Sequence, residues 1–206
     1  MRKRTSRVWI PAIILLVVLC SAAGYIILSP PANASQTNAK NGYVGDYTYV
    51  TSYAGLRYVN KFSVSVTGVS GNSINFVYVQ TESANASVTP KQLDNYSLAF
   101  DPAKPSTFES GSALPLFVAN YLKAGNGTSE LPASGNETAL PFDYSVSIAS
   151  GITRIQFTVG SSTGTEVNWN LAYNETTGFL INGYSTLSSS LIAPSTFEYT
   201  LTAFSN

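Results

Sequence analysis

Side chains that could carry acid–base or nucleophilic chemistry are few in this chain. It has no histidine, and its one cysteine, Cys20, lies inside an apolar run. A serine nucleophile with a histidine base is therefore excluded, as is a metal site built from histidine or cysteine ligands. A serine–lysine pair cannot be singled out, because serine occurs throughout the sequence. We predict no catalytic residue, no metal site and no cofactor.

Carboxylates are the acid–base groups that remain. Glu166 and Glu198 lie at outward positions of predicted strands, and Asp94, Asp101 and Glu109 lie in predicted loops. A glycosidase needs two carboxylates held a short, fixed distance apart. We interpret these residues as ordinary solvated charges, and the sequence therefore predicts a protein that is not an enzyme.

Asparagine supplies a different chemistry, that of N-glycosylation. Six Asn-x-Ser/Thr sequons occur, at Asn33, Asn85, Asn95, Asn126, Asn136 and Asn174. All except the one at Asn95 fall in predicted linkers, loops or strand ends, where a bulky glycan can be accommodated. We expect several to be occupied if the domain is extracellular and the host glycosylates. In a host without N-glycosylation they are only asparagine-rich loops.

The overall charge is low and unevenly placed. Charged residues make up 11% of the chain, against about 25% in a typical globular protein. Four basic residues fall within the first seven positions, whereas seven basic and eleven acidic residues from position 30 onward leave a net charge of −4. An acidic domain without a basic stripe argues against nucleic-acid binding.

The N-terminus has the pattern of a membrane anchor. Residues 8–28 form an uncharged apolar run of 21 residues, which is long enough to span a hydrocarbon core of about 30 Å as a helix. The basic residues of 1–7 should remain in the cytoplasm, which places the C-terminal part outside the cell. The alternative is a secretory signal cleaved near Ala34, after the Ala32-Asn33-Ala34 pattern. The polar stretch 29–42 is then predicted to be a flexible linker.

Alternating apolar and polar residues predict β-strands within residues 43–206. Phe62, Val64 and Val66 alternate with polar residues, and a Gly/Asn turn leads into a second alternating run with Ile74 and Phe76. Such alternation is typical of an antiparallel sheet with one solvated face, and the short turns are typical of a meander. We predict an all-β ectodomain, an antiparallel meander that forms a half-barrel or a sandwich, preceded by a single N-terminal transmembrane helix.

A second block of alternation, from about residue 143 to the C-terminus, has the same character. Ala149–Gly151 and Asn174–Gly178 are predicted turns within it. The last run of this block is predicted to point four residues inward, namely Phe197, Tyr199, Leu201 and Ala203.

The middle of the domain, about 101–142, does not alternate and contains five prolines. Within it, Ser112–Lys123 is predicted to form one short helix that covers an end of the sheet, with Pro115 in its first turn and Gly125 after its end. A buried strand is the alternative, because a short apolar run does not distinguish the two.

Inward-facing aromatic residues are candidates for a ligand site. Tyrosine and tryptophan can line the wall of an apolar pocket and still offer a polar group. The same residues would otherwise form the hydrophobic core, which is the simpler interpretation. The candidates are Tyr47, Tyr49, Phe157, Trp169, Phe179 and Tyr199.

Three features resemble archaeal membrane-anchored surface β proteins of unassigned role. They are the basic-then-apolar start, the strand pattern at 45–49 with 65–79, and the strand–turn–strand pattern at 169–181 (WNLAYNETTGFLI). The last is also similar to the strand-turn-strand pattern of half-barrel lipoprotein-carrier sheets. The resemblance implies a surface β domain and brings no catalytic residues with it.

These patterns predict a membrane-anchored extracellular domain with a structural or interaction role, whose partner is a cell-envelope protein or a glycan. One alternative is a domain that binds or carries an apolar ligand such as a lipid. A second alternative is a secreted subunit of a filament, in which residues 29–53 would complete a neighbour's sheet by strand exchange.

Overall fold

The computed structural model describes the following residues: 37–84, 92–99, 116–120, 122–131, 140–160, 165–190 and 193–206. Within these residues the chain forms ten β-strands and no helix. The strands are β1 (Val44–Tyr53), β2 (Leu56–Ser70), β3 (Ser73–Glu82), β4 (Gln92–Ala99), β5 (Gly125–Leu131), β6 (Leu140–Ala149), β7 (Ile152–Gly160), β8 (Thr165–Asn174), β9 (Leu180–Ser189) and β10 (Ser195–Ser205). The prediction of an all-β domain is confirmed.

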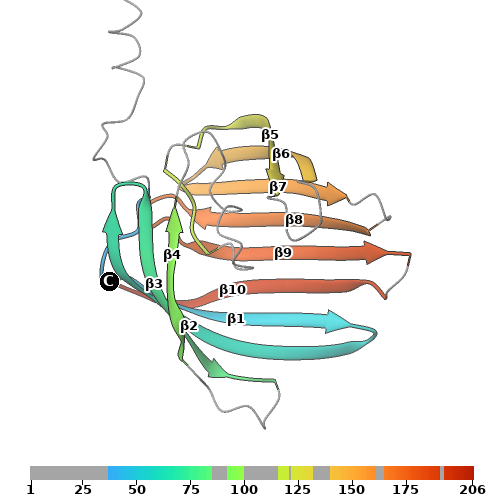
Figure 1. Ribbon diagram of the computed structural model, residues 1–206, viewed down its shortest axis with the longest axis horizontal. Coiled ribbons are helices and arrows are strands. Elements are labelled where there is room, and N and C mark those ends of the chain that lie inside the picture. Colours follow the sequence, from blue (N-terminus) through green and yellow to red (C-terminus); the bar gives the residue numbers. More distant parts are fainter. Residues whose placement is uncertain are drawn as a thin grey trace, which may run out of the picture. The chain divides into compact units, whose positions relative to one another are not determined.

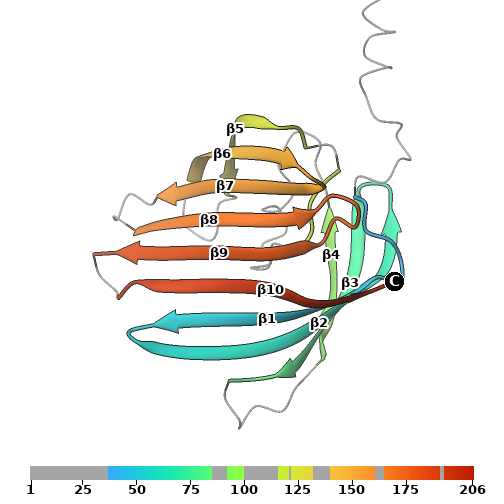
Figure 2. The same ribbon diagram turned by 180° about the vertical axis from the view of Figure 1, so that it is seen from behind.

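All ten strands belong to one open sheet, in the order β4-β3-β2-β1-β10-β9-β8-β7-β6-β5 (Figures 1 and 2). Every neighbouring pair is antiparallel. The sheet therefore consists of two meanders, β1–β4 and β5–β10, joined where β1 pairs with β10. The strands form one sheet and not the two sheets of a sandwich.

Irregular pairing bends this sheet. The register shifts where β2 pairs with β3, where β1 pairs with β10 and where β8 pairs with β9. Bulges of this kind bend the strand that carries them and increase its twist. As a result β3 and β4 run across the direction of β7–β10 (Figure 1). We call the face that carries Tyr47, Phe62 and Phe157 the inner face, and the opposite one the outer face.

Two tight turns join β1 to β2 and β6 to β7. Ala54 and Gly55 have φ angles of 49° and 80°, and Ser150 and Gly151 have φ angles of 54° and 75°. Two successive residues with positive φ are typical of a type I′ turn, whose twist matches that of the flanking strands. The predicted turn at Ala149–Gly151 is confirmed.

The chain must pass from one edge of the sheet to the other between β4 and β5. On this path Leu116–Ala119, here called the crossing segment, is extended and buried. Its backbone pairs with the start of β9: the Val118 amide donates to the Gly178 carbonyl at 3.0 Å, and the Leu180 amide donates to the Leu116 carbonyl at 2.9 Å.

The predicted helix over Ser112–Lys123 is therefore wrong for Leu116–Ala119, which is buried and forms isolated β-bridges at Phe117 and Ala119 without being a full strand. Its four side chains, Leu-Phe-Val-Ala, are all at most 4% exposed. A helix would have paired the backbone with itself, whereas here neighbouring strands supply the partners. Residues 112–115 and 121 lie outside the described ranges.

The end of the predicted linker packs on the sheet. Thr37 and Ala39 are each 3% exposed. Thr37 forms an isolated β-bridge with Ala119, and the Gly42 amide donates to the Val66 carbonyl at 2.9 Å. The ordered domain thus begins by residue 37, whereas 29–36 lie outside the described residues.

The predicted anchor, residues 8–28, also lies outside the described part of the chain. Among the residues that the structure does describe, no helix is long and apolar enough to cross a membrane.

A bulge changes the predicted alternation at the end of β10. Asp46 lies opposite Ala203, but the next residue, Tyr47, lies opposite Leu201, so Thr202 is extra. Ala203 is consequently exposed, contrary to the prediction. The Phe204 ring instead packs on Phe179 with a centroid distance of 5.3 Å.

Candidate functional site

The aromatic residues predicted to be core or ligand-facing divide into two groups. Tyr47, Phe157, Phe179 and Tyr199 are between 0% and 6% exposed and belong to the hydrophobic core. Tyr49 and Trp169 are only partly buried and pack against that core. The inner face therefore serves as core in one part and remains accessible in another.

The closed end of the inner face is the part that the crossing segment covers. The Phe117 ring lies between Phe76 and Phe179, with centroid distances of 5.1 Å and 4.8 Å. Phe76 belongs to β3 and Phe179 precedes β9, so this one ring joins the two meanders. Phe117 and its neighbours are therefore part of the hydrophobic core.

Tyr47 gives the closed end its polar contact. Its hydroxyl donates to the Leu180 carbonyl at 2.9 Å. Burial raises the pKa of Tyr47 well above its ordinary value, and burial raises that of Tyr173 in the same way, with the nearby Tyr47 as a smaller cause. Both phenols are therefore neutral at physiological pH and have structural roles.

A tyrosine cluster lies between the two ends of the inner face. The rings of Tyr49 and Tyr199 stack with centroids 4.6 Å apart. Burial, and then the neighbouring Tyr96 and Tyr49, raise the pKa of Tyr78 to about 12. Burial is also the main cause of the raised pKa of Tyr199, followed by its interaction with Tyr49. The cluster thus presents neutral hydroxyl groups.

The open end of the inner face begins at the next inward pair after Tyr49 and Tyr199, which is Thr51 with Phe197. Strand register there aligns a row that crosses six strands, from β7 through β8, β9, β10 and β1 to β2: Phe157, Trp169, Ser185, Phe197, Thr51 and Tyr58. The rings of Phe157 and Trp169 stack at 6.0 Å and 10°. Trp169 and Phe197 are partly buried, so this row presents apolar surface to the inner side.

The β1–β2 hairpin extends this apolar surface to the rim. Tyr53 lies opposite Leu56, and Tyr58 lies opposite Thr51. Tyr53, Leu56 and Tyr58 are 43%, 56% and 43% exposed. Clusters of exposed apolar side chains are found at interaction surfaces more often than elsewhere on a protein surface.

Charge is confined to the other face in this region. Because side chains alternate between faces, Arg57, Glu166 and Glu198 of the open end project outward. The inward positions in the described parts of β1, β2 and β6–β10 at this end carry no charged side chain.

Ser185 is the exceptional residue of the open end. It is 0% exposed and lies between Trp169 and Phe197 in the row. Its hydroxyl oxygen has no hydrogen-bond partner. A buried hydroxyl without a partner costs free energy, and such groups are rare in folded proteins. Because Ser185 is 0% exposed, a polar group from a ligand would reach it only after a neighbouring side chain moves aside.

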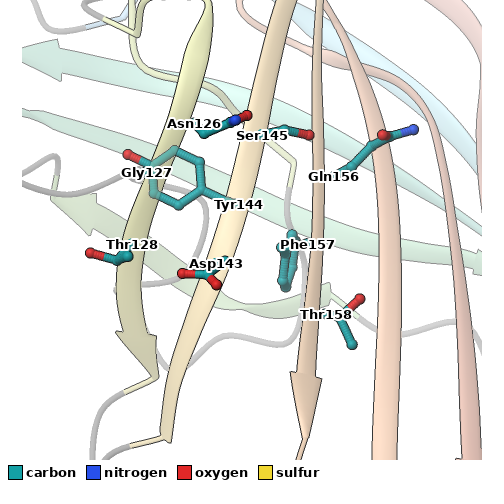
Figure 3. Close-up of a pocket in the computed structure, with 9 residues that line it drawn as sticks. All are labelled: Asn126, Gly127, Thr128, Asp143, Tyr144, Ser145, Gln156, Phe157 and Thr158. Atoms are coloured by element: carbon teal, nitrogen blue, oxygen red, sulfur yellow. The ribbon is translucent and has the colours of Figure 1, made fainter.

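A separate hollow of about 700 Å³ lies on β5, β6 and β7 (Figure 3). Three consecutive residues of each strand line it: Asn126–Thr128, Asp143–Ser145 and Gln156–Thr158. Phe157 points to the inner face, and alternation therefore places six polar side chains on the outer face: Asn126, Thr128, Asp143, Ser145, Gln156 and Thr158.

Gly127 is required on the inner face of β5, behind this hollow, because it lies in the same row as Tyr144 and Phe157. The ring of Tyr144, its partner on β6, lies over it. A methyl group at Gly127 would overlap the Tyr144 hydroxyl, so any other residue would displace that ring.

Three of the six predicted glycosylation sites fall on described residues. Asn95 on β4 and Asn126 on β5 are exposed. Asn174 is partly buried, and its side-chain oxygen accepts from the amides of Thr176 and Thr177, at 2.9 Å and 3.1 Å, which closes the predicted turn. Asn33, Asn85 and Asn136 lie outside the described ranges.

Glu166 and Glu198 do not form a pair of catalytic carboxylates. Glu166 lies opposite Ser188, and Glu198 lies opposite Tyr184 on the same strand, β9. Four residues along a strand correspond to about 13 Å, beyond the separation of about 5–9.5 Å that glycosidases use. Within the described ranges, no three acidic, histidine or cysteine side chains gather as a metal site would require.

Sequence reasoning predicted that Phe197 points inward but did not single out Ser185 or the polar hollow. From polarity alone, Tyr184 of β9 would be predicted to face inward and Ser185 outward. The structure has the reverse, because Ser185 pairs with the inward-facing Trp169 and Phe197. Aligning β9 with the inward positions of β8 and β10 would have predicted the inward orientation of Ser185.

Comparisons with known proteins give no further guide to these sites. Neither a protein-family model, nor a curated protein, nor a solved structure matches this chain.

Proposed function

We propose that this chain is a non-enzymatic binding domain, held on the outside of the cell by residues 8–28, whose open end takes an apolar, uncharged ligand. The uncharged aromatic row of the open end carries this proposal. It offers stacked rings, an apolar rim at the β1–β2 hairpin and no charge. Small-molecule sites commonly have this composition, with a few polar groups for orientation.

Ser185 adds a preference within this ligand class. Its unpartnered hydroxyl lies in the middle of the row. A molecule with a small polar head, such as a monoacylglycerol with its two hydroxyls and ester carbonyl, would give Ser185 the hydrogen bond it lacks once a neighbouring side chain moves aside.

The proposal is tested by the fluorescence of Trp169. The chain has two tryptophans, and Trp9 lies in the predicted anchor, so the full chain is prepared with Trp9→Phe. It is placed in nanodiscs and titrated with a monoacylglycerol whose acyl chain is brominated, because bromine quenches tryptophan on contact. We expect saturable quenching of Trp169. Quenching that rises without saturation would contradict a defined site.

Two tyrosines of equal exposure provide a matched control. Tyr58 on the inner face is 43% exposed, and Tyr184 on the outer face is 44% exposed. Tyr58→Ala should weaken the binding about tenfold, while Tyr184→Ala leaves it unchanged. Equal effects of the two variants would show that the lipid does not distinguish the faces.

Anchoring is a separate part of the proposal. An intact mass measured on the protein from its own membrane should include residues 1–28, with added sugar masses if the sequons are used. A mature chain that begins near residue 35 would instead show a secreted domain, whose open end could still bind the same ligand.

Strand exchange is the weaker alternative. β1, which makes up most of the second half of the 29–53 segment, is already paired on both sides, with β2 and with β10 of its own chain. Giving it to a neighbour would divide the sheet at its centre. The open end has no such cost, and for that reason we favour ligand binding.

A further inference from the structure

The hollow on β5–β7 has a chemistry opposite to that of the open end. Its six outward side chains comprise two amides, three hydroxyl groups and one carboxylate, and no cation lines it. Asn and Gln side chains each donate and accept hydrogen bonds, as do hydroxyls. This set matches a neutral molecule with many hydroxyl groups. Arg154, at the next outward position of β7 beyond Gln156, is not among the residues that line the hollow.

The polar row continues beyond the hollow. Strand register aligns five residues across β5, β6, β7, β8 and β9: Asn126, Ser145, Gln156, Asn170 and Tyr184. At about 4.8 Å for each strand, this row is about 19 Å long, which suits an extended chain of several rings.

Tyr184 adds an aromatic surface to the row, next to Glu198 of β10. It is 44% exposed and lies beside Asn170 of β8 on the outer face. An exposed aromatic ring beside amides and hydroxyls can stack against the apolar side of a sugar ring while the polar groups bond its hydroxyls.

Asn126 supplies a second observation. It lines the hollow and begins the sequon Asn126-Gly127-Thr128, and the edge strand β5 places Asn126 and Thr128 on the same face. A glycan attached to Asn126 would start inside the hollow. The side chains of Asp143 and Gln156 on the adjacent strands would then face its first sugars.

We propose that the row from Asn126 to Tyr184, with the hollow at its β5 end, is a binding site for neutral sugar rings. The sugar is either the glycan of Asn126 itself or a separate polysaccharide, since both present the same hydroxyl-rich rings. The site lies on the outer face and does not depend on the apolar ligand proposed for the open end.

The test uses the full chain in nanodiscs, made in a host without N-glycosylation, with chitotriose, maltotriose and cellotriose as separate probes. Amide shifts in the NMR spectrum are expected along β5–β7 and near Tyr184 for at least one probe. Gln156→Ala and Tyr184→Ala should each weaken that binding about tenfold. Thr200→Ala, on the same face but outside the row, serves as the control and should change nothing.

The native glycosylated chain distinguishes the two sources. If the glycan of Asn126 fills the site, the added trisaccharide produces no shift until that glycan is removed. If the sugar is external, the shifts appear with the glycan present. Absence of shifts in the unglycosylated chain with all three probes, or shifts unaffected by Gln156→Ala and Tyr184→Ala, would overturn the proposal.

Crossed measurements separate this proposal from the preceding one. Tyr184→Ala should reduce sugar binding and spare the quenching of Trp169, and Tyr58→Ala should do the reverse.

Discussion

The two ends of the inner face are built from the same strands and differ in what lies against them. At the closed end, Phe117 of the crossing segment fills the space between Phe76 and Phe179. At the open end, Trp169 and Phe197 lie in the same kind of inward position and stay partly exposed. Identical alternation therefore produces a core at one end and an accessible apolar surface at the other.

This difference shows that one buried tetrapeptide can decide the use of a sheet face. The crossing segment contributes four buried side chains to the core. It also forms two backbone hydrogen bonds, one with Gly178 and one with Leu180 at the start of β9. Where it lies, inward aromatics stabilise the fold. Where it does not reach, Trp169 and Phe197 remain partly exposed.

Removing the central ring of the closed end should have the largest effect. Phe117→Ala is expected to lower the free energy of unfolding by about 3–5 kcal/mol, because it leaves a cavity between the two meanders. Phe197→Ala at the open end should cost clearly less, since that ring is only partly buried. Denaturant unfolding measures both, and equal losses would mean that the two ends are packed alike.

Alkaline pH should act chiefly through the closed end and the tyrosine cluster. Folding raises the pKa of Tyr47, Tyr173 and Tyr199 above the ordinary value near 10. The unfolded chain then loses these protons first, so stability is complete below pH 10 and falls as the pH rises above it. Each buried tyrosine contributes a slope of about 1.4 kcal/mol per pH unit.

The matched measurement is unfolding of the native chain and of Tyr47→Phe between pH 8 and pH 12. Tyr47→Phe should show a shallower loss above pH 10, because one of the contributing groups is gone. A curve identical to that of the native chain would show that Tyr47 ionises alike in both states.

Ser185→Ala should stabilise the unliganded protein by about 1 kcal/mol, because it removes a buried hydroxyl without a partner. Ser195 is a suitable control, since it is 7% exposed and its hydroxyl donates to the Ala193 carbonyl at 3.5 Å. Ser195→Ala should be neutral or slightly destabilising. A loss of stability in Ser185→Ala would show that its hydroxyl has a partner in the folded protein.

The smallest effect on stability is expected at the rim. Leu56→Ser should change the free energy of unfolding by no more than about 0.5 kcal/mol, because Leu56 is 56% exposed. It should still weaken the quenching of Trp169 by a brominated monoacylglycerol. A large loss of stability would indicate that the hairpin tip is part of the core.

The strands of the domain were largely predictable because their side chains alternate strictly. Ile155, Phe157 and Val159 of β7 are buried and the residues between them are exposed, as the pattern of their sequence indicates. β4 and β5 were not identified, since GNGTSEL does not alternate in polarity and QLDNYSLA alternates only over Asn95–Leu98. The error at Ala203 has a similar cause, because a one-residue bulge leaves no mark in the sequence.

The sequence by itself determined the class of the fold, the two strand blocks, the turn at Asn174–Gly178 and the lack of histidine and thiol chemistry in the domain. These features depend on composition and on local periodicity. The tertiary structure alone decided that Leu116–Ala119 is extended, that Ser185 faces inward, and that Asn126 shares a hollow with Gln156. Each of these depends on pairing between residues distant in the chain, and such pairing fixes which neighbours a side chain meets.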